Sequence, residues 1–474
     1  MVVKNSFFYI ASDLFPSALA FLIVPLLTYA LTPEEYGVLA YLGAITMFLN
    51  ALYGLGFNTY IFRSFSISNY QHSNFKMFHS TFWSLVAITT IMSILFYIIF
   101  TSFQISKKVE VDQYAIYVVL TVFLFGLTVV PMTFLRIKEK AKEFFYLTIS
   151  FSMIEYFFII VLVVYLGLGV EGKLLSRIIG YLFFITLILY FFRKLLFRNF
   201  FDKSHTIQAL KYGPTFAVGT FLFILIDVAD RFILERYVSI ENLGLYSVAY
   251  GLAFVLMALN KGVSKALQPY IIKKTKLNDV KVLFEVINKS KRFVNIVTFT
   301  STIIFLLLID IFVKLTFKSS YHSALEYMLF LSIVPMFYAH YNIYSSVLIA
   351  YGKKKFFLKA MSYGLLVNVI LNLILIPFIG VYGAIVSTIF AYITMMLLTY
   401  REFKKITLLP MKIDPSFYGF LIILTITIFL LYLNFFESTT FRIIATFIIM
   451  STLISYLYFF LNLRSKHDLA NLLQ

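Results

Sequence analysis

The sequence predicts an all-α polytopic membrane protein with about 14 transmembrane helices, and two observations lead to that fold class. Of its 474 residues, 61% are hydrophobic and only 13% are charged, whereas a soluble domain carries roughly 25% charged residues. The chain also contains successive stretches of roughly 20 mostly apolar residues, the length that an α-helix needs to cross a bilayer. Only helices and closed barrels satisfy the backbone in lipid, and apolar runs of this length form helices.

The predicted spans follow one another from near the start of the chain to its end. Their approximate bounds are residues 7–29, 38–62, 79–103, 114–135, 145–169, 174–192, 212–233, 243–267, 293–317, 327–350, 358–378, 381–400, 416–434 and 441–463. The first apolar stretch is longer than the core of a signal peptide, and no small-residue cleavage site follows it. We therefore expect it to be an uncleaved first span.

The distribution of charge predicts the orientation in the membrane. The chain has 40 Lys and Arg residues against 22 Asp and Glu residues, a net charge of +18. A basic balance indicates nucleic acid or an anionic membrane surface as a partner, and the apolar background favours the membrane and argues against nucleic acid. Most of the Lys and Arg residues lie in the connections on the side of the N-terminus, so both termini are expected in the cytosol.

The residue types that the chain lacks disfavour several kinds of chemistry. It contains no Cys, which excludes disulfides, thiolate metal sites and a cysteine nucleophile. It has no G-x-x-x-x-G-K-[ST] motif, so ATP hydrolysis is not expected. The predicted outer loops are short, the longest being about residues 104–113, and neither face carries paired carboxylates or a cluster with metal-ligand spacing. We therefore expect no cofactor and no metal, and a polymerase or glycosyltransferase is the least favoured function.

Two joins between spans are similar and predict an internal repeat. Residues 34–38 read EEYGV between the first two spans, and residues 241–245 read ENLGL between the seventh and eighth. Both joins lie on the predicted outer side, which fits a parallel repeat of six spans. The predicted units are an N-terminal lobe of spans 1–6 (residues 1–211), a C-terminal lobe of spans 7–12 (residues 212–415), and a final helix pair with a cytosolic tail (residues 416–474).

An ordered set of motifs runs from residue 25 to about residue 400. The set consists of PLLTYALTPEEYG at 25–37, Gly54-Leu55-Gly56, Arg63, Leu135-Arg136, DRFIL at 230–234, LGLY at 243–246, Asn368, Asn372, Pro377, Gly380, Gly383-Ala384 and Ser387-Thr388. In these residues the chain resembles the polysaccharide flippases of the multidrug/oligosaccharidyl-lipid/polysaccharide (MOP) superfamily, which translocate O-antigen and capsule repeat units. The last two predicted spans carry none of these motifs.

The resemblance implies a fold and a function. The fold would be two six-helix lobes around a central cavity, in a bacterial cytoplasmic (inner) membrane. The function would be to carry an undecaprenyl-pyrophosphate-linked oligosaccharide from the cytosolic to the periplasmic leaflet by alternating access, with ion or proton coupling. The implied partners are this lipid-linked oligosaccharide, membrane lipid, and a polysaccharide polymerase with its chain-length machinery. A small-molecule or multidrug exporter of the same superfamily is the alternative.

Four basic residues in or beside the spans are candidates for binding the pyrophosphate: Arg63, Arg231, Lys261 and Lys265. Lys261 and Lys265 are four residues apart in the inner third of the eighth span, so they share a helix face. The alternative is that their long side chains reach the cytosolic headgroups and bind nothing else. Arg63 lies at the inner end of the second span, where it matches the first motif.

Ionisable groups inside spans are costly and therefore become candidates for ion coupling or gating: Asp13, Glu155, Asp227, Asp230 and His340. Glu155 lies deepest, about 15 Å along the fifth span, where a carboxyl group can exchange a proton near neutral pH. The alternatives are a hydrogen-bonded packing role for Glu155, a local salt-bridge cluster of Asp227, Asp230 and Arg231, and a buried hydrogen-bonding role for His340.

Overall fold

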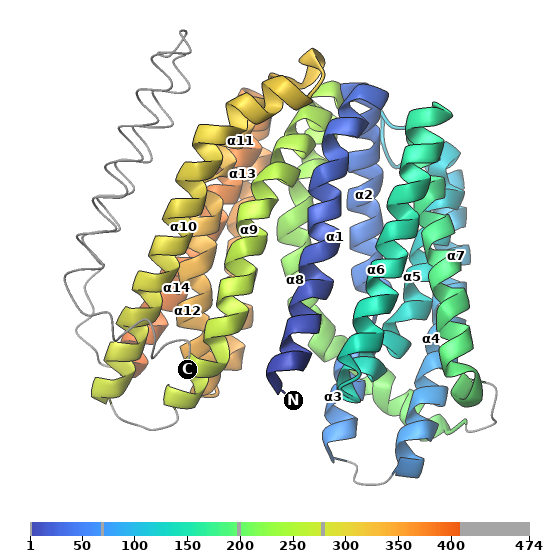
Figure 1. Cartoon of the computed structure of the whole chain (residues 1–474), viewed down its shortest axis with the longest axis vertical. Helices are drawn as coiled ribbons and strands as arrows, with labels where there is room; N and C mark the ends of the chain where they lie inside the picture. The colour runs from blue at the N-terminus through green and yellow to red at the C-terminus, as the bar shows by residue number, and fades with distance from the viewer. Residues whose placement is uncertain (1, 68–70, 197–200, 276–279, 408–474) are drawn as a thin grey trace.

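All the regular structure that the protein shows over its described residues is helical. The computed structural model describes residues 2–67, 71–196, 201–275 and 280–407 (Figure 1). No strand occurs within these ranges, which confirms the predicted all-α class. The predicted spans at 416–434 and 441–463 lie outside the described residues.

The first half of the chain, as we call residues 2–196, contains seven α-helices. They are α1 (Val2–Ala30), α2 (Pro33–Tyr53), α3 (Phe57–Ile67), α4 (Gln71–Ser102), α5 (Val111–Ile137), α6 (Ala141–Ile159), which a π-helical segment (Ile160–Tyr165) extends, and α7 (Gly169–Leu196). The residues at the start of α2 favour a helix N-terminus, because Thr32 and Glu35 form a capping box and Pro33 occupies the first turn. Together α2 and α3 cover the second predicted span, divided where Leu55 and Gly56 take positive φ values of 42° and 68°.

The second half, residues 203–407, also contains seven α-helices. They are α8 (Lys203–Tyr237), α9 (Ile240–Thr275), α10 (Val280–Thr316), which a 3₁₀ turn (Ser319–Tyr321) follows, α11 (Ala324–Leu331), α12 (Val334–Ala350), α13 (Lys354–Ile379) and α14 (Val381–Thr407). The tenth predicted span is divided into α11 and α12 just before Pro335, whose ring removes a backbone donor from the helix. Each of the first twelve predicted spans thus corresponds to one helix or to two consecutive ones.

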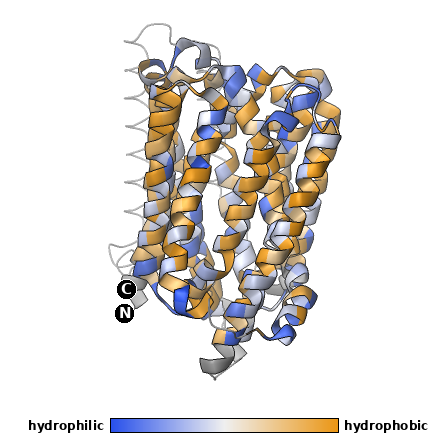
Figure 2. Ribbon diagram, turned by 90° about the vertical axis from the view of Figure 1, so that its right-hand side faces the viewer, coloured by the Kyte–Doolittle hydropathy of each residue, from blue (hydrophilic) through white to orange (hydrophobic). Residues whose placement is uncertain are grey.

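The composition of these helices matches a membrane environment. Within the described residues, 9 helical segments are long and apolar enough to cross a bilayer, and a shorter apolar helix runs over Leu14–Ala30. Hydrophobic residues dominate the middle of the helices, and hydrophilic residues gather towards their ends (Figure 2). We call the end of the bundle that holds the turns at residues 31–32 and 238–239 the upper end, as in Figure 1, and the opposite one the lower end. The charge distribution predicts that the upper end is the outer face.

The two halves approach each other closely at the upper end, where α2 crosses α9. A Cβ atom on Gly244 would lie 1.9 Å from the backbone oxygen of Pro33, and one on Gly37 would lie 2.0 Å from that of Ile240. Only glycine permits this approach. These two glycines are among the residues that the two similar joins share, so the sequence similarity marks a place where the halves meet.

Polar contacts add to this junction at the upper end. The hydroxyl of Ser106 donates to Glu235 Oε1 at 2.6 Å, and Lys108 Nζ donates to the backbone oxygen of Val238 at 2.6 Å. The phenol of Tyr321 donates to the backbone oxygen of Leu31 at 3.1 Å. Each of these bonds joins the first half to the second.

The hydrophobic cores follow the same division. The largest cluster of buried residues takes members from both halves, including Tyr41 on α2 and Tyr246 on α9. Towards the lower end there are two separate clusters, one around Phe78 in the first half and one around Val347 in the second. The halves thus share a core towards the upper end and have their own cores towards the lower end. The predicted boundaries at residues 211 and 415 stay a prediction.

α8 connects the two halves along its length. Near its start, Gly213 packs so closely on Gly56 that a Cβ atom on Gly56 would lie 2.0 Å from the Gly213 oxygen. Nearby, the Tyr60 hydroxyl lies 3.1 Å from His205 Nδ1. Towards its end, α8 packs on helices of the second half and places three charged residues among them.

Candidate functional site

The second half contains a buried ion cluster on α8, which we call the second-half ion cluster: Asp227, Asp230 and Arg231. Asp230 is 0% exposed and Asp227 is 9% exposed. Arg231 Nη1 lies 3.3 Å from Asp230 Oδ1 and also donates to the backbone oxygen of Asp227. The predicted local salt bridge therefore forms, with Asp230 as the carboxylate partner.

Three tyrosine hydroxyls complete the hydrogen bonding of these carboxylates. Tyr246 donates to Asp230 Oδ2, while Tyr250 and Tyr392 donate to Asp227 Oδ1 at 3.1 Å and 3.4 Å. Tyr246 and Tyr250 are one turn apart on α9, so both can face α8, and Tyr392 comes from α14. The Tyr250 ring also lies under the Arg231 guanidinium, 4.6 Å from its carbon. Sequence reasoning did not identify these tyrosines because their partners are on other helices.

Lys261 lies on α9, closer to the lower end, and is surrounded by aromatic rings. Its Nζ is 4.4 Å from the centroid of the Phe254 ring, 5.1 Å from that of Phe223 and 5.8 Å from that of Tyr338. Cation–π attraction stabilises an ammonium group in such surroundings. Among the described residues it forms no ion pair. Lys265, one turn further along α9, is exposed.

The first half contains its own ion cluster, which we call the first-half ion cluster: Glu155 on α6 with Lys173 and Arg177 on α7. Glu155 is 4% exposed, and its Oε1 lies 3.2 Å from Lys173 Nζ and 3.1 Å from Arg177 Nε. α6 and α7 can meet here because Gly180 has no side chain; a Cβ atom there would be 3.2 Å from Glu155 Cβ. Neither cation was among the predicted site residues, although their i, i+4 spacing was a visible signal.

The other candidates lie apart from these clusters. His340 is buried on α12, with Nδ1 3.0 Å from the backbone oxygen of Met336, an arrangement that fits the alternative of a packed hydrogen-bonding residue. Asp13 is in α1 and Arg63 in α3, but their side chains lie outside the described residues. The functional roles of all these residues stay predictions.

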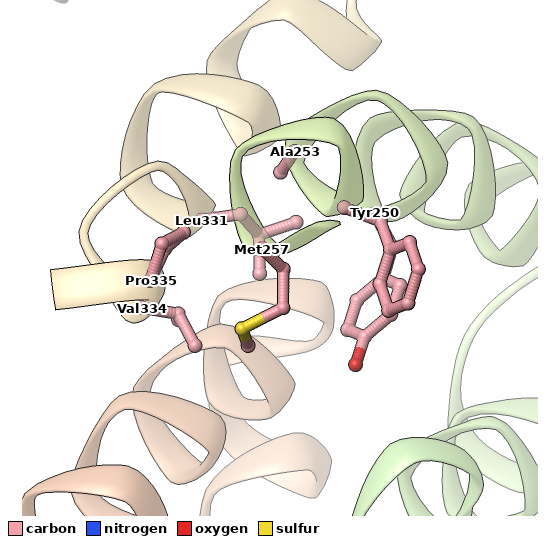
Figure 3. A pocket seen from close by; sticks show the side chains of 7 residues that line it. Tyr250, Ala253, Met257, Leu331, Val334 and Pro335 are labelled. Carbon is pink, nitrogen blue, oxygen red and sulfur yellow. The ribbon is translucent and has the colours of Figure 1, made fainter. Parts of the chain in front are cut away.

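Next to the second-half ion cluster lies a small cavity between α9, α11 and α12 (Figure 3). Its volume is about 20 Å³, enough for roughly one water molecule. It is lined by Tyr250, Ala253, Phe254, Met257, Leu331, Val334 and Pro335. Over the part of the chain that the structure describes, no group of three or more His, Asp or Glu side chains could hold a metal ion.

Comparisons with known proteins agree with this architecture. Residues 26–326 match the family model described as polysaccharide biosynthesis protein. An uncharacterized membrane protein of Methanocaldococcus jannaschii is 24% identical over 415 residues, which make up 83% of this chain and 96% of that protein.

Two solved structures are similar in fold. One is the lipid II flippase MurJ in an inward closed conformation, with a TM-score of 0.71, 18% identity, and coverage of 95% of this chain and 98% of MurJ. The other is an inward-facing multidrug resistance MATE family transporter of the MOP superfamily, with a TM-score of 0.68, 11% identity, and coverage of 83% and 96%. At these identities the likeness concerns the fold alone.

Proposed function

Since the chain belongs to the polysaccharide biosynthesis protein family, we propose that it is a multi-pass membrane transporter of the MOP superfamily, whose fold it shares, and that it flips a lipid-linked oligosaccharide. The substrate would be an undecaprenyl-pyrophosphate-linked repeat unit. It would move from the cytosolic to the outer leaflet of a bacterial cytoplasmic membrane, with both termini of the protein in the cytosol. A polysaccharide polymerase with its chain-length machinery would use the flipped product.

The observation that carries this proposal is a difference in contacts between Lys261 and the two carboxylates nearer the upper end, Asp227 and Asp230. Asp227 and Asp230 accept bonds from tyrosine hydroxyls, and Arg231 is paired with Asp230. A site for a cationic drug needs an available carboxylate, and these two are occupied. Lys261, in contrast, is a cation with aromatic neighbours. Asp227 acts on it electrostatically, but among the described residues no carboxylate lies within salt-bridge distance of it, which favours an anionic substrate such as a pyrophosphate.

The basic residues of α9 are arranged along a path. Lys265 is exposed and lies about 6 Å nearer the lower end than Lys261, at a rise of about 1.5 Å per residue. The pyrophosphate would meet Lys265 first and Lys261 next, while Arg231 lies nearer the upper end. Carrying the charged head group across hydrocarbon without such cations is prohibitive, whereas the polyprenyl tail can stay in lipid.

The arrangement of cores supports alternating access. The halves share a core and several hydrogen bonds towards the upper end, and have separate cores towards the lower end. The start of α8 belongs to the lower core of the first half through Ala209, so moving the lower ends apart would leave each lower core intact only if this segment moves with the first half. We propose that this state receives substrate from the cytosol, and that Glu155, Asp227, Asp230, His340 and Asp13 are candidates for coupling an ion or proton to the return step.

The proposal is tested by reconstitution. The protein is placed in vesicles with a fluorescent undecaprenyl-pyrophosphate-linked oligosaccharide, and the fraction that becomes accessible on the opposite leaflet is measured. We expect flipping by the wild type and at least a tenfold lower rate for Lys261→Ala, because a charged hydrogen bond is worth about 1.5–3 kcal/mol. Lys359→Ala is the matched control, since Lys359 is exposed and also lies 5.8 Å from an aromatic ring, that of Tyr363.

Two results would contradict the proposal: no flipping by the wild type, or equal rates for Lys261→Ala and Lys359→Ala. The second candidate function is export of a small molecule, which the likeness to a multidrug resistance transporter favours. Efflux of a cationic dye from the same vesicles, without flipping of the lipid, would support that function instead.

A further inference from the structure

The first-half ion cluster carries an excess of positive charge. It contains one carboxylate, that of Glu155, and two cations, and both cations contact the same oxygen, Oε1. Arg177 uses only Nε for this contact. Its two terminal amino groups donate no hydrogen bond to any described residue. Since a guanidinium offers five donors in a planar fork, the side that suits a two-point contact with an oxyanion is still available.

Arg177 is also partly exposed. Its side chain is 43% exposed, against 12% for Arg231. At about 100° per residue, Lys173, Arg177 and Tyr181 form one stripe along α7 that continues into the buried residues Phe184 and Ile188. The exposed leucines of α7, at positions 182 and 189, lie on a different side of the helix. Arg177 is therefore a partly exposed cation on the stripe of α7 that carries the buried residues Phe184 and Ile188.

Aromatic side chains flank the two cations. Lys173 Nζ lies 5.8 Å from the centre of the Tyr156 ring. Tyr181, one turn after Arg177, packs against Phe151 with ring centroids 4.6 Å apart. Glu155 holds Arg177 through Nε alone, which leaves the terminal amino groups out of this contact. The arrangement positions a guanidinium and does not neutralise it.

We propose that Lys173 and Arg177 form a second oxyanion site, which binds a phosphate or carboxylate group of the transported lipid-linked molecule. This inference rests on the proposed function. Lys173 and Arg177 lie about 6 and 12 Å from the start of α7, and Lys261 lies about 30 Å from the start of α9. Both helices start at the upper end, so the two sites are at different depths. The anion is either the pyrophosphate after it has left Lys261, or an acidic sugar that docks while the pyrophosphate is still at Lys261.

A binding experiment tests the site without relying on transport. The Lys261→Ala variant of the full chain is purified in detergent and titrated with inorganic pyrophosphate and, separately, with glucuronate. We expect at least one of these anions to bind, and we expect Arg177→Gln in the same background to weaken that binding about tenfold or more. Arg193→Gln is the matched control, because Arg193 is an exposed arginine on the same helix whose guanidinium lies 5.1 Å from the Tyr190 ring; it should change nothing.

Glu155→Gln separates an anion site from a purely structural salt bridge. If Arg177 binds an anion, Glu155→Gln keeps or strengthens the binding because it removes the competing negative charge. If Arg177 only pairs with Glu155, the variants Glu155→Gln and Arg177→Gln should lower the melting temperature equally, and neither should change the affinity for the anion. That result would overturn the proposal. Absence of binding by both anions, or equal binding with and without Arg177, overturns it as well. If Arg177→Gln does not fold, Arg177→Lys replaces it in the binding experiment, because it keeps the charge and loses the planar fork of donors.

A transport experiment then identifies the source of the anion. Two lipid-linked oligosaccharides, one neutral and one with a single glucuronic acid, are flipped by the wild type, Arg177→Gln and Arg193→Gln proteins. A loss with both substrates assigns the site to the pyrophosphate, and a loss with the acidic substrate alone assigns it to the sugar. Equal rates for Arg177→Gln and Arg193→Gln with both substrates would contradict the inference. If the wild-type protein flipped neither of the two lipid-linked oligosaccharides, that result would instead contradict the proposed function.

Discussion

The two ion clusters use the same kinds of residue to opposite effect. The second-half ion cluster has two carboxylates and one arginine, is almost completely buried, and receives three tyrosine hydroxyls. The first-half ion cluster has one carboxylate and two cations, and its arginine is 43% exposed. The difference is one of saturation: the charged groups of the second-half cluster are matched by partners, whereas the first-half cluster has donors left over. We infer that the former contributes more to the stability of the fold, whatever its part in coupling, and that the latter is open to a ligand.

The largest expected effect follows from the burial of Asp230. Asp230→Ala leaves Arg231 and the Tyr246 hydroxyl buried without their partner, which costs about 3–5 kcal/mol of unfolding free energy. Asp310→Ala is the control, because Asp310 pairs with Lys314 at 2.9 Å and Lys314 is 46% exposed; it should cost less than about 1 kcal/mol. Chemical denaturation in detergent measures both. Similar costs would show that the second-half cluster is not a stabilising one.

The next effect concerns the junction that holds the two clusters in one molecule. Gly244→Ala places a Cβ atom against the backbone of Pro33 and should cost about 1–3 kcal/mol through overpacking. It should also loosen the upper end. Because the chain has no Cys, a single Ser106→Cys reports this opening as faster labelling by a membrane-impermeant maleimide. Gly251→Ala, where a Cβ atom has no neighbour within 4 Å, should leave labelling unchanged; equal labelling of both variants would argue against this junction.

A smaller stability effect is expected in the first-half ion cluster. Glu155→Ala removes the partner of two cations, but water can hydrate Arg177, so the expected cost is about 1–2 kcal/mol, below the usual cost of breaking a buried pair. The same denaturation assay measures it. Glu143→Ala, also on α6, removes an exposed pair with Lys140, the residue before this helix, and should have no measurable effect. If Glu155→Ala lowered the unfolding free energy as much as Asp230→Ala does, the two clusters would not differ in their contribution to stability.

The smallest effect tests the role of the tyrosine hydroxyls. Tyr250→Phe removes the hydrogen bond to Asp227 and keeps the ring under Arg231, so it should cost about 0.5–1.5 kcal/mol. Tyr181→Phe, in the first-half region, removes a hydroxyl for which the described residues show no hydrogen-bond partner, and should cost nothing. Thermal melting of the purified variants compares them. No difference between the two variants would mean that the tyrosines do not saturate the carboxylates.

Local features of the protein could be predicted from the sequence. The helices follow from runs of apolar residues, and the capping box at Thr32 and Glu35 follows from its spacing. Asp227, Asp230 and Arg231 are neighbours on one helix, so their interaction was also predictable. The repeated glycines Gly37 and Gly244 were visible as an echo of two turns. Their contact with each other's helices was not visible, because it depends on how α2 crosses α9.

The partners of the charged residues could not be predicted in the same way. Lys173 and Arg177 meet Glu155 from a different helix, and Tyr392 reaches Asp227 from α14. Hydropathy is a sum along the chain, so it carries no information about which side chains face each other across two helices. For the same reason the sequence identified Glu155 as the deepest carboxyl but not its partners, whereas the structure shows it in contact with two cations.

The sequence by itself therefore determined the all-helical membrane architecture, because lipid requires each span to satisfy its own backbone within roughly 20 residues. It also contained the ordered motifs of the family. The tertiary structure alone decided which charges are saturated and which are available. Helix packing in a membrane depends on close contacts between particular side chains, and glycines such as Gly180 and Gly244 determine where those contacts occur.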